Sequence, residues 1–227
     1  MKKILFAIGS MGHGGTESQL LHLIKSLSRK NISISVFLME SKGPLLHELK
    51  SLDIKLYEGK FLTHEIQLVS YYRFFRSFLY LLRILFTNRF SLIQSYLPMM
   101  NFLCVIAGTL TFHKVWTGWR GMTSHQITKP YFNFLDSICN LLSYGINSNA
   151  KAILEDKVKK EKFMSLKKSV VIPNYMPRGN IVKISSETFE RERGKFTKQN
   201  DILLFCVSNL ISYKGHADLL NALKILQ

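Results

Sequence analysis

Short apolar runs alternate with longer amphipathic stretches along most of the chain. The runs typical of strands are Lys3–Ile8, Ile32–Leu38, Ile54–Tyr57, Leu92–Ser95, Val115–Gly118, Tyr144–Asn147 and Val170–Pro173. Helices are expected near Thr16–Ser28, Pro44–Leu52, Ile66–Phe86, Asn101–Leu110, Tyr131–Leu142 and Ala150–Lys162. Runs that are apolar at nearly every position indicate strands covered on both faces. The alternation therefore predicts an α/β fold built on a doubly wound parallel sheet.

The pattern changes after residue 175, which divides the chain into three predicted parts. Residues 1–175 form the α/β domain, and the polar residues 176–200 form a linker with a helix at Ser186–Lys195. Residues 201–227 repeat the N-terminal layout of strand, glycine-containing loop and leucine-rich helix. We therefore expect them to be the incomplete start of a second, similar domain, because a piece below about 40 residues rarely buries its own core.

Composition narrows the class of protein. Of 227 residues, 47% are apolar, which indicates a globular core and excludes wholesale disorder. Cys104, Cys139 and Cys206 form no CxxC pair, which argues against a disulfide scaffold or zinc ribbon and favours a reducing compartment. The histidines show no metal-binding spacing, so no metal site is expected. No uncharged apolar run is long enough to predict a membrane-spanning helix.

The net charge of +16 is unevenly distributed. Between Ile66 and Leu135 there are seven Lys or Arg residues and no acidic residue. Arg73, Arg76 and Arg83 share one side of the helix predicted there, and the other side carries Phe75, Phe78, Leu79, Leu82 and Phe86. This pattern is typical of a helix at an anionic bilayer surface, and also of a core helix whose arginines face water. The lysines from Lys157 to Lys168 are expected to form a solvated helix face.

The loop from Gly9 to Glu17 follows the first predicted strand and is the first candidate site. In open α/β sheets, ligands bind at this carboxyl edge. Gly14 and Gly15 would let a ligand approach the backbone, and the helix start, with Thr16 as the expected N-cap, would attract an anion. His13 either faces the same cleft or is simply solvated. A turn without a ligand is the alternative; a dinucleotide site with Glu40 is disfavoured because the GxGxxG pattern is incomplete.

Three further loops carry polar residues at predicted strand ends. Arg120 and Gly121 follow the fifth strand, where an arginine can bind a phosphate or sugar hydroxyls, or can be structural. Ser148 or Asn149 is expected to cap the next helix. Lys214 precedes the last helix, whose N-terminus would form a phosphate site with it.

Together these residues resemble the retaining GT-B glycosyltransferases of family 4. Gly14–Glu17 (GGTE) is similar to the family's GGxE loop, and Val171–Met176 (VIPNYM) to its VIPNGV segment. Val207–Leu223 resembles the stretch that opens the C-terminal domain, and Trp119–Met122 (WRGM) resembles an IRG-type loop. Asn209 stands where the family has an arginine, and the family's paired-glutamate motif would lie beyond Gln227.

The resemblance implies a Rossmann-like N-terminal domain that binds the acceptor, followed by the start of a nucleotide-sugar-binding domain. Gly14, Gly15 and Lys214 would bind the donor phosphates, and His13, Arg120 and Gly121 would line the acceptor cleft. The substrate would be a nucleotide-sugar, with no cofactor and no metal. The expected partners are a lipid-linked or growing glycan and, through Arg73, Arg76 and Arg83, an anionic membrane surface, but no nucleic acid.

The same resemblance implies a peripheral protein at the inner, cytoplasmic face of the membrane. Two other interpretations stay open. The chain could be a non-catalytic acceptor and membrane-docking module that pairs with a separate donor-domain chain, as in the split eukaryotic N-acetylglucosamine transferase. It could also be an inactive, truncated gene product.

Overall fold

The computed structural model describes residues 2–59, 67–121, 130–175, 183–198, 201–208, 210–211 and 214–226. Within these residues the chain divides into two units, Met1–Tyr175 and Met176–Gln227. Each unit is described by itself below.

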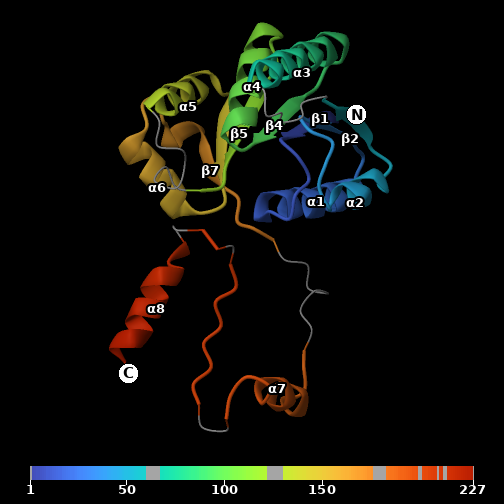
Figure 1. Ribbon diagram of the computed structural model, residues 1–227. Coiled ribbons are helices and arrows are strands. Elements are labelled where there is room, and N and C mark those ends of the chain that lie inside the picture. Colours follow the sequence, from blue (N-terminus) through green and yellow to red (C-terminus); the bar gives the residue numbers. More distant parts are fainter. Residues whose placement is uncertain are drawn as a thin grey trace. The chain divides into compact units, whose positions relative to one another are not determined.

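The first unit is built on a seven-stranded sheet in the order β3-β2-β1-β4-β5-β6-β7 (Figure 1). The strands are β1 Lys2–Ile8, β2 Ile32–Leu38, β3 Lys55–Glu58, β4 Leu92–Tyr96, β5 Val115–Trp119, β6 Gly145–Ser148 and β7 Ser169–Val171. Every neighbouring pair is parallel. The predicted doubly wound α/β sheet is confirmed. Its strand order reverses between β1 and β4, which makes their carboxyl ends the switch point where ligands bind in such folds.

The helices lie where the amphipathic stretches predicted them. They are α1 Gly15–Leu27, α2 Leu46–Lys50, α3 Gln67–Thr87, α4 Pro98–Leu110, α5 Pro130–Leu142 and α6 Lys151–Lys160, with a short 3₁₀ helix at Leu166–Lys168. Helix α4 begins three residues earlier than predicted, with Pro98 in its first turn. Proline suits this position because its missing N–H would have no partner there and its fixed φ is helical.

Alternating residues of β1 divide the core into two layers. Phe6 and Ile8 pack with Leu20, Leu21 and Ile24 of α1. Leu5 and Ala7 point the other way, into a larger cluster with residues of α3, α4 and α5, which include Leu81, Leu85, Cys104 and Cys139. Helices α1 and α2 therefore cover one face of the sheet, and α3, α4 and α5 cover the opposite face (Figure 1). Burial raises the pKa of the Cys139 thiol to about 12.

A buried ion pair lies beside the end of β5. Lys157 of α6 is fully buried, with its Nζ 2.5 Å from Oε1 of Glu161 and 3.6 Å from the ring centroid of Trp119. Asn140 of α5 donates a hydrogen bond of 3.0 Å to Oε2 of the same Glu161. The expectation of a solvated lysine face is therefore wrong for Lys157. The cause is its position on the inner turn of α6, next to Ile153 and Leu154 of the core.

Lys168 also departs from the predicted solvated face. Its Nζ donates hydrogen bonds to backbone carbonyl oxygens at the end of α5, those of Asn140, Leu141 (3.2 Å) and Ser143 (3.1 Å). A cation at this position stabilises the negative end of a helix. Partial burial lowers the pKa of Lys168.

The second unit contains two helices among its described residues, α7 Ser186–Arg193 and α8 His216–Ile225. The predicted linker helix is confirmed as α7, and its N-cap Ser185 accepts a 3.2 Å hydrogen bond from the Thr188 N–H. The strand expected at the start of residues 201–227 is not found, because residues 201–207 have no regular secondary structure. A strand needs a partner strand, and the described part of this unit holds none. Ile202 and Val207 are consequently 87% and 93% exposed.

Candidate functional site

The loop between β1 and α1 lies at the carboxyl edge of the sheet. Gly14 is the N-cap of α1, with φ −72° and ψ 156°, and among the described residues no side chain caps this helix. The predicted cap, Thr16, is wrong because the helix already begins at Gly15. His13 is exposed on the same loop.

The two glycines of this loop differ in what surrounds them. A Cβ on Gly14 would collide with the Glu17 carboxylate, whereas a Cβ on Gly15 would meet no described atom within 4 Å. The carboxylate of Glu17 is therefore folded back over the start of α1. A helix N-terminus favours negative charge, so a phosphate that approached Gly14 would compete with Glu17, while the approach to Gly15 is open.

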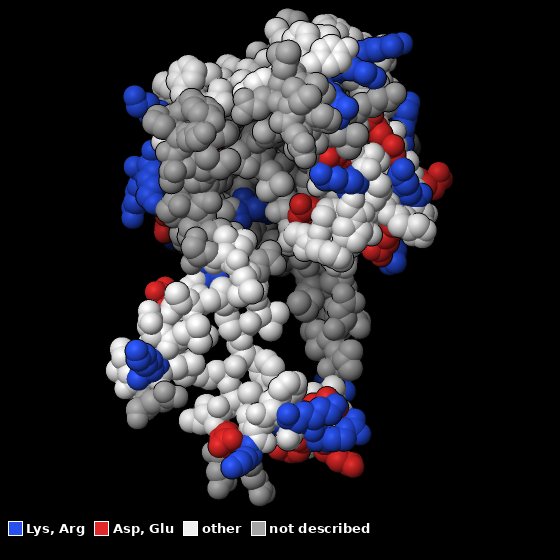
Figure 2. All heavy atoms as spheres, in the orientation of Figure 1, with Lys and Arg blue, Asp and Glu red and all other residues white. Residues whose placement is uncertain are grey.

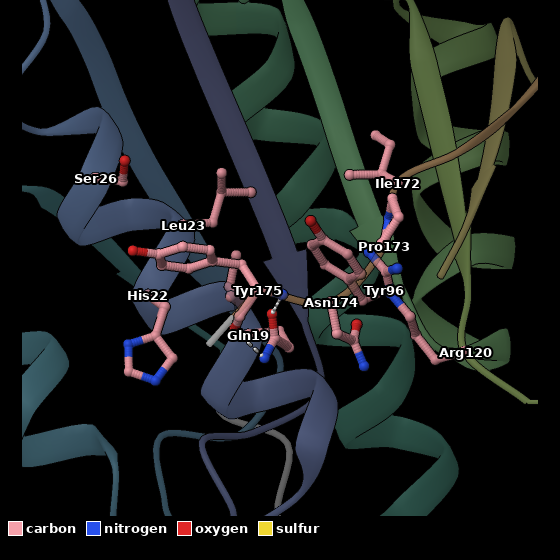
Figure 3. A pocket seen from close by; sticks show the side chains of 11 residues that line it. Gln19, His22, Leu23, Ser26, Tyr96, Arg120, Ile172, Pro173, Asn174 and Tyr175 are labelled. Carbon is pink, nitrogen blue, oxygen red and sulfur yellow. Dashed lines mark hydrogen bonds between the residues drawn. The ribbon is translucent and has the colours of Figure 1, made fainter. Parts of the chain in front are cut away.

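A pocket of about 330 Å³ lies between α1 and the chain that follows β7 (Figure 3). It also borders the carboxyl ends of β4 and β5, since Tyr96 ends β4 and Arg120 follows β5. The lining residues are Gln19, Leu20, His22, Leu23, Ser26, Tyr96, Arg120, Ile172, Pro173, Asn174 and Tyr175. This apolar cavity with a few polar groups is the usual form of a small-molecule site.

Gln19 fastens one wall of the pocket. Its amide Nε2 donates to the carbonyl oxygen of Tyr175, and its Oε1 accepts from the Tyr175 N–H, both at 2.7 Å (Figure 3). The side chain thus pairs with the backbone as a neighbouring strand would. Because Gln19 lies near the start of α1, the chain after β7 is held against that helix, which keeps the pocket walls together.

Arg120 and Tyr96 form the opposite wall. The guanidinium carbon of Arg120 lies 5.1 Å from the centroid of the Tyr96 ring. Burial raises the pKa of Tyr96, and the charge and hydrogen bond of Arg120 oppose this rise. The Nε of Arg120 is buried and has no hydrogen-bond partner among the described residues. The pocket wall therefore contains a guanidinium group whose Nε–H can still donate a hydrogen bond. Such a group can bind an anion or a sugar hydroxyl.

Gly118 permits this arrangement. A Cβ there would lie 2.7 Å from Cδ1 of Tyr96 and 2.8 Å from the carbonyl oxygen of Ser95. We expect Gly118→Ala to force the Tyr96 ring away from β5 and to lower the free energy of unfolding by about 1–3 kcal/mol. Chemical denaturation would measure the loss. The control is Gly121→Ala, where the added Cβ meets no described atom within 4 Å; equal losses in the two variants would contradict the expectation.

Buried polar atoms without hydrogen-bond partners gather at the ends of β5 and β6. Among the described residues they are Thr117 Oγ1, Trp119 Nε1, Arg120 Nε, Asn147 Oδ1 and Asn149 Oδ1. Neighbouring groups are well paired, since Ser95 Oγ donates to Asn101 Oδ1 at 2.8 Å and Asn147 Nδ2 donates to Gln94 Oε1 at 2.6 Å. Buried polar groups are nearly always satisfied by protein, water or ligand. These atoms are therefore available to ordered water or to a bound polar molecule.

The structure brings only one of the predicted site residues of the first unit, Arg120, into the pocket. His13, Gly14 and Gly15 lie on another loop of the same edge, and Gly121 follows Arg120. Sequence reasoning missed Tyr96, Gln19, Asn174 and Tyr175 as lining residues. The last two stand inside the VIPNYM segment, so that motif was an available signal. Residues 122, 176 and 209, which belong to the quoted motifs, lie outside the described residues.

The predicted cap of α6 is wrong, and Glu40 at the end of β2 has a partner of its own. Ala150, rather than Ser148 or Asn149, is the N-cap of α6, and the Ser148 hydroxyl instead bonds the backbone of Ala150. Glu40, the acid of the disfavoured dinucleotide site, forms an ion pair of 2.6 Å with Lys42. The described part of the chain contains no cluster of three potential metal ligands and no helix long and apolar enough to span a membrane.

Lys214 lies in the second unit, directly before Gly215. Gly215 is the N-cap of α8 and has a positive φ of 73°, which a glycine adopts without strain. The hydroxyl of Ser208 lies 3.0 Å from Nε2 of His216, and Sγ of Cys206 lies 3.5 Å from Nδ1 of the same ring. The loop before α8 is thus organised around His216, with Lys214 exposed beside the helix start.

Comparison with known proteins finds no matching family model and no matching curated protein. Among solved structures, HepE of Anabaena in complex with UDP matches with a TM-score of 0.75 at 18% identity. The match covers 98% of this chain and 57% of HepE. A glycosyltransferase from Rickettsia africae matches with a TM-score of 0.69 at 18% identity, over 100% of this chain and 58% of that one.

A UDP-N-acetylglucosamine 2-epimerase has the same fold, with a TM-score of 0.58 at 9% identity over 77% of this chain and 49% of the epimerase. The chain thus spans somewhat more than half the length of the first two neighbours. These likenesses confirm a Rossmann-like fold of the kind found in GT-B glycosyltransferases. At such identities they establish the fold, while the reaction depends on the site.

Proposed function

We propose that this chain is a glycosyltransferase of the retaining GT-B kind, or the acceptor-binding part of one. It would move a sugar from a nucleotide-sugar to a lipid-linked or growing glycan in surface polysaccharide synthesis. The observation that carries the proposal is the pocket at the carboxyl edge, where Arg120 has a buried Nε beside buried polar atoms of β5 and β6, none of which has a hydrogen-bond partner among the described residues. Two neighbours support it, since HepE was solved with UDP-glucose and the Rickettsia protein is a glycosyltransferase.

In this proposal Lys214 of the second unit binds the donor phosphates. Gly14 and Gly15 of the first unit are further candidates for phosphate binding, with the backbone open at Gly15 and covered at Gly14 by the Glu17 carboxylate. Transfer leaves a nucleoside diphosphate that carries the negative charge of the broken sugar–phosphate bond. A lysine and helix N–H groups that are positioned before the reaction would stabilise that charge in the transition state. Arg120, Gly121 and His13 would face the acceptor, and Arg120 would bind its hydroxyl or phosphate groups. No general base is assigned.

The proposal places the protein at the inner face of the membrane, where lipid-linked glycans are built. The chain spans 57% of HepE. The proposal therefore includes two forms of the same function. In one, this polypeptide transfers the sugar; in the other, it binds the acceptor and a separate donor-domain chain supplies the rest of the site.

Calorimetric titration with UDP, UDP-glucose and GDP tests the donor site. We expect Lys214→Ala to weaken UDP binding by about 10- to 100-fold, because a hydrogen bond to a charged group contributes about 1.5–3 kcal/mol. The matched control is Lys224→Ala, which removes an exposed lysine from the other end of α8. Equal affinities of the two variants, or no binding of any nucleotide by the wild type, would overturn the donor-site assignment.

Product analysis tests the reaction and separates transfer from epimerisation. Incubation with a nucleotide-sugar and membrane lipid extract should give a glycosylated lipid or glycan, either from the chain alone or after a second chain is added. Release of an epimerised sugar nucleotide would contradict the proposal. Arg120→Gln should lower transfer more than Arg29→Gln, because Arg29 is exposed at the amino edge, away from the pocket.

A further inference from the structure

Helix α3 exposes an apolar stripe on its outer face. The stripe consists of Tyr71, Tyr72, Phe75, Leu79 and Phe86, which are 48–71% exposed. Of the apolar side predicted from the sequence, only Phe78 and Leu82 pack against the core. The apolar side predicted from the sequence is therefore only partly buried. The structure shows a buried face and an outer apolar stripe, with the exposed Arg76 and Arg83 one step around the helix from that stripe.

The end of α4 adds an unusual aromatic residue. Its last turn closes with hydrogen bonds from the Phe112 N–H to the Thr109 carbonyl and from the His113 N–H to the Gly108 carbonyl, at 3.4 and 2.8 Å. This Schellman pattern puts Phe112 at the position normally taken by glycine, and its φ is 58°. A bulky residue is strained there, and Phe112 is also 91% exposed. Neither the strained backbone nor the exposed ring of Phe112 stabilises the fold of this chain by itself. Both are explained if Phe112 contacts a binding partner.

The ends of α3 and α4 lie side by side. The His113 ring places Nε2 3.2 Å from the Asn88 carbonyl oxygen and its centroid 6.2 Å from that of Phe90. Arg89, between Asn88 and Phe90 in the sequence, and Lys114, directly after His113, are both exposed. Phe112 therefore lies near the end of α3 at the amino edge of the sheet, in a region where Arg83, Arg89 and Lys114 are also exposed. In Figure 2 the charged side chains at the top of the view, over α3, are basic.

From these observations we propose that the α3 stripe and Phe112 form a docking surface for an anionic lipid bilayer. Aromatic side chains prefer the bilayer interface, and neighbouring arginines and lysines add attraction to acidic headgroups. The sequence from Ile66 to Leu135 contains no acid that would oppose this attraction. Glu58, which lies near Arg76, pairs with Lys50 at 2.7 Å. A second copy of this chain would meet the same positive charges, which disfavours it as the occupant.

The surface deepens the proposed function, because a lipid-linked acceptor would be held in the bilayer that this surface binds. It covers the α3 and α4 side of the sheet and ends with Phe112 at the amino edge, whereas the pocket borders α1 and the carboxyl edge. The docking surface rests on the proposed function only in the assumption that the acceptor is linked to a lipid. Binding to vesicles requires neither nucleotide nor sugar.

Vesicle sedimentation with the whole chain tests the surface. The probe is phosphatidylcholine with one third phosphatidylglycerol, compared with pure phosphatidylcholine. We expect Phe112→Gly to weaken binding to the acidic vesicles about tenfold, because it removes a large apolar side chain. Glycine fits the positive φ, so the same variant should fold at least as stably as the wild type. The matched control is Phe163→Gly, also at positive φ (60°) and 59% exposed, on another element.

A charge series completes the experiment. Removing three charges by Arg76→Gln, Arg83→Gln and Arg89→Gln should weaken binding about a hundredfold, since each basic residue near an acidic surface contributes about 1 kcal/mol. The control removes three exposed lysines elsewhere, by Lys159→Gln, Lys162→Gln and Lys167→Gln. The proposal is overturned if both triple variants bind alike, if Phe112→Gly and Phe163→Gly bind alike, or if the wild type ignores acidic lipid. It is equally overturned if Phe112→Gly changes only the oligomeric state in light scattering.

These outcomes are separate from those of the nucleotide titration. A chain that binds acidic vesicles through Phe112 but binds no nucleotide would keep the docking surface and lose the donor site. The reverse result would keep the donor site and lose the surface.

Discussion

Replacing Lys157 with Met is expected to lower the free energy of unfolding by about 3–5 kcal/mol. The substitution keeps the size of the side chain but leaves Glu161 buried without its cation. Its carboxylate would retain the hydrogen bond from Asn140, which cannot replace a charge 2.5 Å away. Urea denaturation followed by circular dichroism measures the loss. Trp119, under the ammonium group, should report the same transition by fluorescence.

The control for this prediction is Lys160→Met on the same helix. Lys160 pairs with Asp156 at 2.5 Å, but its side chain is 47% exposed, and such surface pairs contribute about 0–1 kcal/mol. Adding Glu161→Met to Lys157→Met should recover much of the lost stability, because no charge is then left uncompensated. Similar losses for Lys157→Met and Lys160→Met would show that the pair is not buried in solution.

The second large effect is a dependence of stability on pH through Asp136. Burial, and then the nearby charge of Glu161, raise the pKa of Asp136 to about 7, while Lys157 opposes the rise. The folded state therefore holds a proton that the unfolded state has released above its own pKa of 3.8. The protonated Asp136 therefore stabilises the fold fully below pH 3.8, and this stabilisation is lost as the pH rises through about 7. The free energy of unfolding falls over this range by at most about 4 kcal/mol.

Asp136→Asn isolates this contribution, because it removes the titration and keeps the shape. The variant should gain stability relative to the wild type as the pH rises from 5 to 8. Denaturation at several pH values measures the difference, and Asp53→Asn, at an exposed position, serves as the control. A constant difference between wild type and Asp136→Asn across this range would rule out a raised pKa.

The sheet and its helices were predictable because apolar runs and amphipathic stretches differ in period and length. The pocket was not, since Tyr96 and Arg120 meet only through the pairing of β4 with β5, and this register places Tyr96 beside Gly118. The lysine-rich composition of this stretch also concealed the burial of Lys157, because Lys159, Lys160 and Lys162 nearby are exposed. Phe112 was missed for a related reason: nothing in a one-dimensional pattern marks a phenylalanine that occupies the position of a C-terminal glycine. In the second unit, the apolar run at 202–207 gave a strand signal, but a strand cannot form without a partner.

The burial of the cysteines has a practical consequence for observing the second unit. Cys104 and Cys139 lie in the core of the first unit, where burial raises their pKa and leaves them as thiols of low reactivity. Cys206 is exposed in the loop region that precedes α8. A maleimide dye or spin label should therefore attach to Cys206 in the wild-type sequence. The loop beside Lys214 could then be followed spectroscopically during a nucleotide titration without introducing or removing a single residue.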